Sequence, residues 1–219
     1  MLSLYPAEPL SRVLAIGCHA DDIEIGCGGT LLDLTRSNPG LEVDWVVLAA
    51  PGERGDEARA SAAAFLAAAG SARVEVHGLR DGFLPHLGTE VKELFEDLKG
   101  RVDPQVVFTH TRHDLHQDHR LACELTWNTF RNHLILEYEI PKVDGDLGRP
   151  NVFVPLSVAT AEEKVTLLER HFPSQSGKHW FDRELFLGLM RVRGMEAVAP
   201  ERFAEAFTCR KLTLAGKRT

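Results

Sequence analysis

Short apolar runs that alternate with helical segments constrain the fold of this chain more than any other feature of its sequence. Three such runs occupy the first half of the chain, at residues 13–18, 45–50 and 106–109, and a further strand is expected between the last two, at residues 73–79. Short runs that are nearly all apolar are typical of strands buried on both faces of a sheet. Strands that alternate with helices predict βαβ units, and therefore a parallel sheet with helices on both faces.

Helical patterns separate these runs, and the last third of the chain is less regular. Helices are expected at residues 30–34, 56–69, 89–99, 120–133, 161–170 and 182–192, and further strands at 134–140, 152–156 and 204–212. The glycine-rich stretch 26–30 has two interpretations: close approach of the backbone to a ligand, or tight packing of a helix on the sheet. It lacks the Gly-x-Gly-x-x-Gly pattern, so a dinucleotide site is not predicted.

Length and composition narrow the class of protein. A chain of 219 residues predicts one domain over residues 1–219. The formal net charge is −7 and there is no basic run, which argues against a nucleic-acid partner. The first twelve residues do not resemble a signal peptide, and no apolar run is long enough for a transmembrane helix. Four cysteines without a C-x-x-C pair favour a reduced, cytoplasmic location.

Two clusters of metal-binding residue types follow the first and the fourth predicted strands. They are HADD at residues 19–22 and DLHQDH at residues 114–119. Ligands of parallel sheets sit beyond the carboxyl ends of the strands, so we expect both clusters to share one crevice. Imidazole and carboxylate groups suit zinc, and a catalytic zinc takes three protein ligands and leaves one position for water. Of the adjacent Asp21 and Asp22, one is expected to bind the metal and the other to accept a proton from metal-bound water.

Both clusters resemble the signatures of a known family. The stretches AIGCHADDIEIGCGGTLL and THTRHDLHQDHRLA are similar to the two metal-binding motifs of the PIG-L/LmbE-like family of zinc-dependent N-deacetylases. Weaker similarity continues through GERGDEARASAAAFLAAAG, LRDGFL, ERHFPSQSGKHWF and RGMEAVAPERFAEAF, over about residues 12 to 212. The resemblance implies a Rossmann-like three-layer α/β/α sandwich with a mostly parallel sheet.

The resemblance also implies the metal ligands and the general base. His19, Asp22 and His119 match the three zinc ligands of the family. Asp21 matches the carboxylate that acts as general base.

Two further residues of the second motif match supporting roles. His116 matches the histidine that stabilises the oxyanion or protonates the leaving amine, and Asp118 matches the acid that orients a nearby histidine. The chain departs from the family pattern at Ala20, where a proline is usual. It departs again at Asp114, where some relatives place a tyrosine near the oxyanion. An ionised carboxylate cannot donate a hydrogen bond, so Asp114 puts that contact in doubt.

Three residues are candidates for substrate binding: Arg54, Asp81 and His171. Each has an ordinary alternative, because an arginine on a helix is often a surface residue and Asp-Gly is also a turn signal. Residues 142–150 form a candidate loop for homo-oligomerisation.

The predicted function is hydrolysis of a linear amide. We expect removal of an N-acetyl group from an N-acetylglucosamine-type amino sugar or sugar conjugate, by Asp21-assisted attack of zinc-bound water. One alternative is an amidase that cuts a larger acyl group or a thiol conjugate on the same zinc frame. Another is a non-enzymatic metal- or sugar-binding module. The ligand types also suit iron(II) and cobalt(II), and the sequence leaves the sugar carrier open.

Overall fold

A seven-stranded sheet forms the centre of the computed structural model, which describes residues 3, 6 and 8–213. The strand order is β3-β2-β1-β4-β5-β7-β6. Strands β1 to β5 pair in parallel, and β7 runs antiparallel to both β5 and β6. This confirms the predicted, mostly parallel sheet. The strands are β1 (Arg12–Gly17), β2 (Glu42–Val47), β3 (Ser71–Val76), β4 (Val106–His110), β5 (Leu134–Tyr138), β6 (Val152–Leu156) and β7 (Phe203–Thr208).

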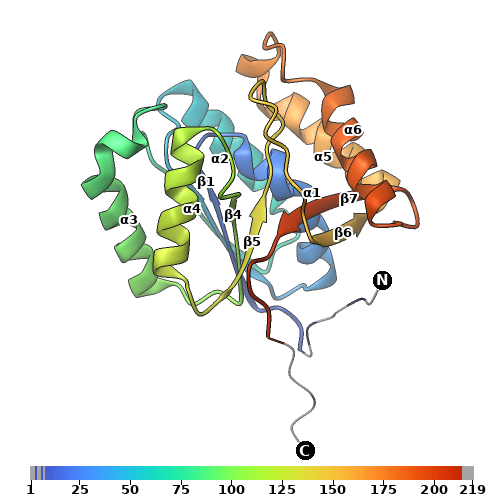
Figure 1. Cartoon of the computed structure of the whole chain (residues 1–219), viewed down its shortest axis with the longest axis horizontal. Helices are drawn as coiled ribbons and strands as arrows, with labels where there is room; N and C mark the ends of the chain where they lie inside the picture. The colour runs from blue at the N-terminus through green and yellow to red at the C-terminus, as the bar shows by residue number, and fades with distance from the viewer. Residues whose placement is uncertain (1–2, 4–5, 7, 214–219) are drawn as a thin grey trace, which may run out of the picture.

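Helices cover both faces of the sheet, so the three-layer sandwich is confirmed (Figure 1). Helices α3 and α4 pack together on one face, and α1, α2, α5 and α6 cover the other. A separate cluster of buried apolar side chains lies under each layer. The helices are α1 (Asp22–Ser37), α2 (Glu53–Phe65), α3 (Gly88–Arg101), α4 (Gln117–Thr129), α5 (Val158–His171) and α6 (Arg183–Glu196).

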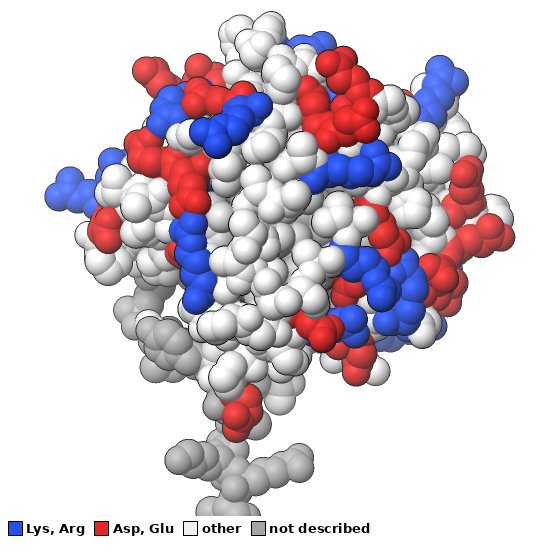
Figure 2. Space-filling view, turned by 180° about the vertical axis from the view of Figure 1, so that it is seen from behind, with Lys and Arg blue, Asp and Glu red and all other residues white. Residues whose placement is uncertain are grey.

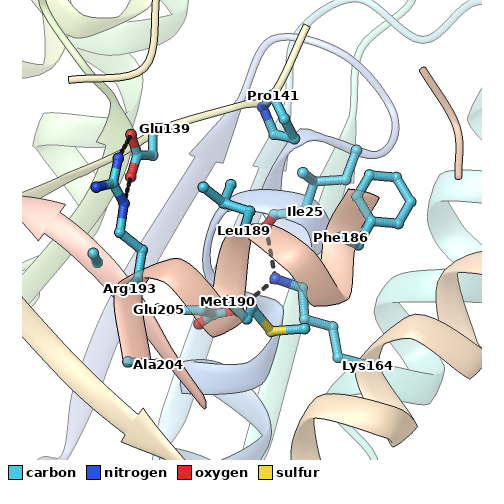
Figure 3. Close-up of a pocket in the computed structure, with 12 residues that line it drawn as sticks. Ile25, Glu139, Pro141, Lys164, Phe186, Leu189, Met190, Arg193, Ala204 and Glu205 are labelled. Atoms are coloured by element: carbon cyan, nitrogen blue, oxygen red, sulfur yellow. Dashed lines mark hydrogen bonds and ion pairs between the residues drawn. The ribbon is translucent and has the colours of Figure 1, made fainter. Parts of the chain in front are cut away.

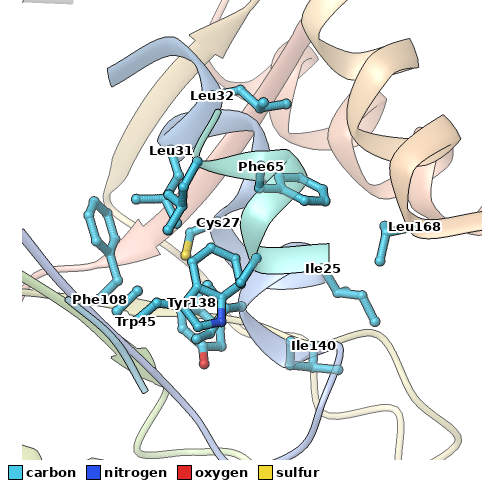
Figure 4. Close-up of a cluster of buried hydrophobic side chains, with 14 of the residues drawn as sticks. Ile25, Cys27, Leu31, Leu32, Trp45, Phe65, Phe108, Tyr138, Ile140 and Leu168 are labelled. Carbon is cyan, nitrogen blue, oxygen red and sulfur yellow. The ribbon is translucent and has the colours of Figure 1, made fainter. Parts of the chain in front are cut away.

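Helix α1 begins earlier than its sequence pattern predicts. The pattern indicates a helix at residues 30–34, whereas α1 starts at Asp22 and continues through the glycine-rich stretch. A Cβ atom at Gly26 would lie only 2.2 Å from the ring of Tyr138. Figure 4 shows the Tyr138 ring in the apolar cluster beside α1. The structure therefore supports tight helix–sheet packing as the reason for Gly26.

The surface carries charges of both signs. In Figure 2, lysine and arginine side chains are interspersed with acidic ones, and no extended area of the face shown is basic alone. None of the described helices is long and apolar enough to cross a bilayer. The expectation that the chain does not begin with a signal peptide concerns its first twelve residues, and some of these lie outside the described residues.

Candidate active site and metal centre

The structure brings the two predicted clusters together at the carboxyl edge of the sheet. His19 lies in the turn after β1, where Asp21 is the N-cap of α1 and Asp22 its first residue. On the neighbouring strand β4, the following turn leads to His116, the N-cap of α4, and to His119 in its first turn. Both pairs of residues belong to βα units of adjacent parallel strands, which is why they meet.

The three predicted ligand residues form a tight triangle of donor atoms. Nδ1 of His19 lies 3.1 Å from Nε2 of His119 and 3.3 Å from Oδ2 of Asp22. The third side, from His119 Nε2 to Asp22 Oδ2, measures 3.5 Å. Zinc bonds of about 2.0–2.1 Å in a tetrahedron place neighbouring ligand atoms about 3.3–3.4 Å apart. The donor set and its spacing therefore fit a tetrahedral zinc ion, with the fourth position left to a non-protein ligand.

Asp114 fixes the orientation of the His119 ring. Its Oδ2 lies 2.9 Å from His119 Nδ1, and its side chain is only 1% exposed. Burial acts to raise the pKa of Asp114, but the hydrogen bond and charge of His119 hold that pKa well below its usual range. The ionised carboxylate accepts the Nδ1 proton, which leaves the lone pair of Nε2 for a metal. Asp114 thus supports a ligand, a role that its departure from the family pattern did not suggest.

His110 is a close neighbour of the triangle that lies within the second motif but was given no role in it. It is the last residue of β4, fully buried, and its ring stacks on His119 with centroids 3.8 Å apart. Its Nε2 lies 3.2 Å from Asp22 Oδ2. Burial lowers the pKa of His110 to about 4, so the ring is neutral at pH 7. Its place directly after a predicted strand was the available sequence signal.

Asp21 stands apart from the triangle and pairs with Arg54 of α2. The Arg54 Nη2 lies 3.0 Å from Asp21 Oδ2, in an ion pair outside hydrogen-bond geometry. Arg54 is also held by Glu57, at 2.7 Å, and it donates to the hydroxyl of Ser174. Burial raises the pKa of Asp21, while the charge of Arg54 acts against this rise. Asp21 is therefore a carboxylate next to the ligands with an oriented cationic partner.

His116 presents a proton donor beside the triangle. Its Nδ1 accepts a hydrogen bond from the backbone N–H of Asp118 at 3.3 Å. Because a neutral imidazole has one donor and one acceptor nitrogen, this contact leaves the proton on Nε2. Burial and the charges of His119 and His19 lower the pKa of His116, which favours this neutral form. The ring centroid lies 4.9 Å from that of His19 and 4.6 Å from that of His119.

Two carboxylates face the far nitrogen of His19. Asp81 Oδ1 lies 3.0 Å and Asp118 Oδ2 3.4 Å from His19 Nε2. Asp118 is buried and also accepts the backbone N–H groups of Gly82 and Leu84. These acceptors favour a proton on His19 Nε2, so that Nδ1 faces the triangle. Asp81 differs from the other members of the cluster because its side chain is 70% exposed.

His171 is the predicted site residue with the weakest tie to the cluster. It ends helix α5, and within residues 8–213 its ring makes no hydrogen bond or ion pair with the residues above. The residues that follow it in the chain contact the Arg54–Glu57 pair instead. The Phe172 ring lies 5.3 Å from the Arg54 guanidinium, and Ser174 donates from its backbone N–H and its hydroxyl to Glu57.

A cavity of about 20 Å³ lies behind the site, between α1, α5, α6 and β7. Figure 3 shows the buried Lys164 beside Glu205 and the backbone carbonyl of Ile25. None of the predicted site residues lines this cavity. Its polar groups already pair with each other, so the histidine and carboxylate cluster, not this cavity, is the candidate site.

Comparison with known proteins gives a match to a family model. The family model for GlcNAc-PI de-N-acetylase (PIG-L) matches residues 14–130, just over half of the chain. No curated protein sequence matches the chain.

Three solved structures show the same fold at low sequence identity. A conserved protein of Thermus thermophilus is 21% identical, with a TM-score of 0.74 over 96% of this chain and 100% of that chain. The N,N'-diacetylchitobiose deacetylase of Pyrococcus horikoshii is 21% identical, with a TM-score of 0.66 over 91% and 84%. GalB, the 4-carboxy-2-hydroxymuconate hydratase of Pseudomonas putida KT2440, is 16% identical, with a TM-score of 0.74 over 96% and 100%. These likenesses concern the fold, which carries more than one kind of chemistry.

Proposed function

The chain belongs to the PIG-L family of GlcNAc-PI de-N-acetylases, and from that premise we propose that it is a zinc-dependent N-deacetylase. The proposed reaction removes the acetyl group from an N-acetylglucosamine-type amino sugar or sugar conjugate and releases acetate and a free amine. The observation that carries the proposal is the triangle of His19, Asp22 and His119, with donor atoms 3.1–3.5 Å apart. The deacetylase named among the solved structures supports the same activity class.

In this proposal His19, Asp22 and His119 hold the metal. Zinc, when bound, supplies a Lewis acid that polarises the acetamide carbonyl and makes water a better nucleophile at neutral pH. Asp114 keeps the proton of His119 on Nδ1, and Asp118 does the same for the proton on Nε2 of His19. Both contacts keep the ligand nitrogens unprotonated and aimed at one point.

Asp21 is the proposed general base. Its carboxylate is 5% exposed and belongs to the same turn as two of the ligands, but it is left out of the triangle. It accepts the proton of the attacking water, and the Arg54 guanidinium at 3.0 Å keeps the carboxylate oriented for that step. This assigns Arg54 a positioning role, in addition to the substrate contact expected from the sequence.

His116 is the proposed donor to the reacting amide. With Nδ1 occupied by the backbone N–H of Asp118, the Nε2 proton is available for the oxyanion or for the leaving nitrogen. Asp81 is the most exposed carboxylate of the cluster and is proposed to accept hydrogen bonds from sugar hydroxyls. His171 is proposed only as a contact for a more distant part of the substrate.

The test is acetate release from N-acetylated amino sugars by the zinc-loaded protein and by the Asp21→Asn variant. We expect the variant to fold and bind zinc normally, and to lose about 10²–10⁴-fold in turnover, as expected for loss of a general base. Wild-type turnover in the variant would contradict the assignment of Asp21. A series of longer N-acyl groups in the same assay separates the deacetylase from an amidase of larger acyl groups. Zinc binding without hydrolysis of any member would favour a binding module.

A further inference from the structure

Lys142 is separated from the proposed metal ligand His119 by a single side chain, that of Asp114, although it comes from a distant part of the chain. It belongs to the loop between β5 and β6, and its Nζ lies 2.9 Å from Asp114 Oδ2. The same oxygen lies 2.9 Å from Nδ1 of His119. One carboxylate oxygen therefore joins this ammonium group to a metal ligand.

The ammonium group of Lys142 has no free proton for substrate. It has three protons, and the acceptors around it are Asp114, both carboxylate oxygens of Asp146 at 2.6 and 2.8 Å, and the carbonyl of Ile140 at 3.4 Å. The side chain is only 13% exposed. Lys142 can therefore influence the site only through the groups it holds.

Lys142 separates two buried carboxylates. The side chain of Asp114 is 1% exposed and that of Asp146 is 5% exposed. Asp146 is fixed in place because its Oδ2 also accepts the backbone N–H of Leu115, the residue next to Asp114. Without the cation, two like charges would face each other in a site where water screens them little. Of these two carboxylates, Asp114 is the one that contacts a proposed metal ligand, so its displacement would also move His119.

We propose that Lys142 is a positioning residue that sets the zinc affinity of the site. It offsets the charge of Asp146, and this keeps Asp114 aligned with His119. The inference rests on the proposed function in one respect, namely that the triangle of His19, Asp22 and His119 binds zinc. It adds that the loop between β5 and β6, which lies outside the matched family region, tunes this centre.

The test measures zinc affinity by competition with a chromophoric chelator, in the full chain at about pH 7.5, where Asp114 is ionised. Loss of a group that hydrogen-bonds the non-ligating nitrogen of a metal-bound histidine weakens metal binding by about 10–100-fold. Because Lys142 acts through Asp114, we expect Lys142→Met to weaken zinc binding by about tenfold, at the lower end of that range. Lys99→Met removes the same charge from an exposed position on α3 and should leave the affinity unchanged. Thermal unfolding of the metal-free proteins checks that each variant is folded.

The decisive comparison is the double variant Lys142→Met/Asp146→Asn. It removes one positive and one negative charge, and the side-chain carbonyl introduced by Asp146→Asn can still accept the Leu115 N–H. We expect its zinc affinity to return to within about threefold of the wild type, since the repulsion is gone. If the lysine merely anchored the loop, the double variant would be as weak as the single one, and that result would overturn the inference.

Two further outcomes separate a failure of the inference from a failure of the proposed function. Wild-type affinity in a folded Lys142→Met variant would overturn the inference and leave the proposed function intact. No zinc binding by the wild type would overturn the proposed function, and the inference with it. If Lys142→Met is too unstable to purify, Lys142→Gln replaces it, with the same expected loss and the same double variant with Asp146→Asn.

Discussion

The two parts of this molecule contribute to the candidate site in different ways. Residues 12–130 form strands β1 to β4 and helices α1 to α4, and they supply all of the proposed metal ligands, the base and the proton donor. Residues 131–213 contact the same site through polar side chains that hold its supporting residues. Lys142 touches Asp114, and Ser174 touches Glu57. In the proposed function, the first part therefore carries the chemistry and the second part adjusts it.

Packing differs between particular positions of the two parts. Gly26 in α1 has the Tyr138 ring where a Cβ atom would be, whereas Gly188 in α6 has open space there. Val198, just after α6, is 83% exposed and adopts a left-handed backbone with φ 53°. Gly26 is therefore expected to tolerate no larger side chain, whereas Gly188 and Val198 are expected to tolerate or even profit from a substitution.

The sharpest test of this difference is an alanine at each of two helix glycines. Gly26→Ala forces a Cβ atom against Tyr138, whose hydroxyl donates to the carbonyl of Ile16. We expect a loss of about 3 kcal/mol in the free energy of unfolding, at the upper end for overpacking. The matched Gly188→Ala variant should gain about 0.5–1 kcal/mol from helix propensity. Urea denaturation measures both, and equal effects at the two positions would contradict the comparison.

His116→Ala tests the chemistry assigned to the first part. Removal of the proposed donor should lower kcat by about 10²–10³-fold, equivalent to about 2.7–4 kcal/mol of transition-state stabilisation. The variant should keep its zinc, and loss of the N-cap hydrogen bond from the Asp118 N–H to Nδ1 of His116 should cost only about 1 kcal/mol of stability. Steady-state kinetics and metal analysis of the same sample decide this. Loss of the metal would instead make His116 a ligand.

Glu57→Gln tests the contact that joins the two parts, and its effect depends on pH. Burial alone would raise the pKa of Glu57, but hydrogen bonds from Ser174 and Arg54 hold it below the usual value. A carboxyl group with a lowered folded pKa stabilises the protein above its unfolded pKa of about 4.3, and loses this effect as the pH falls through the folded value.

At pH 7 we therefore expect Glu57→Gln to be less stable than the wild type by about 1.5 kcal/mol, since its hydrogen bonds are no longer to a charged group. Below about pH 4.3 this difference should begin to shrink, and the two proteins should converge only once the pH is below the lowered folded pKa of Glu57. Denaturation curves from neutral pH down to about pH 2, a range that passes through the lowered folded pKa, measure the difference. A gap that stays constant over this range would show that the charge of Glu57 does not strengthen the contact.

A small effect is also expected at Val198, in the second part. A β-branched residue in the left-handed region costs about 1–2 kcal/mol, and glycine relieves this strain at the cost of backbone entropy. We expect Val198→Gly to raise the unfolding free energy by about 1 kcal/mol and to leave turnover unchanged. Reduced turnover would show that the turn after α6 affects the site.

The sequence predicts the fold and the polar cluster because both depend on local patterns, and the family resemblance adds the choice of the ligand set. Buried strands of five or six residues with helices between them give the topology, and the polar turns after β1 and β4 give the cluster. The start of α1 was placed too late, because glycines in a sequence indicate a weak helix. Only the three-dimensional position of Tyr138 explains Gly26 within it.

Contacts between residues far apart in the chain could not be predicted in this way. Nothing in the loop sequence connects Lys142 with Asp114, and the role of Asp114 itself follows from its distance to His119. Arg54 was expected at the substrate, and the structure adds its ion pair with Asp21. Such pairs form where strand ends meet, so their partners are set by topology rather than by spacing along the chain.

The central claim is that one zinc ion is held by His19, Asp22 and His119, and the most direct measurement is the metal content per chain. Elemental analysis should be made side by side on untagged wild-type protein and on His119→Ala, both purified without chelator. We expect close to one zinc per wild-type chain and much less in the variant. A folded wild type without metal, or equal zinc in the two proteins, would contradict the claim.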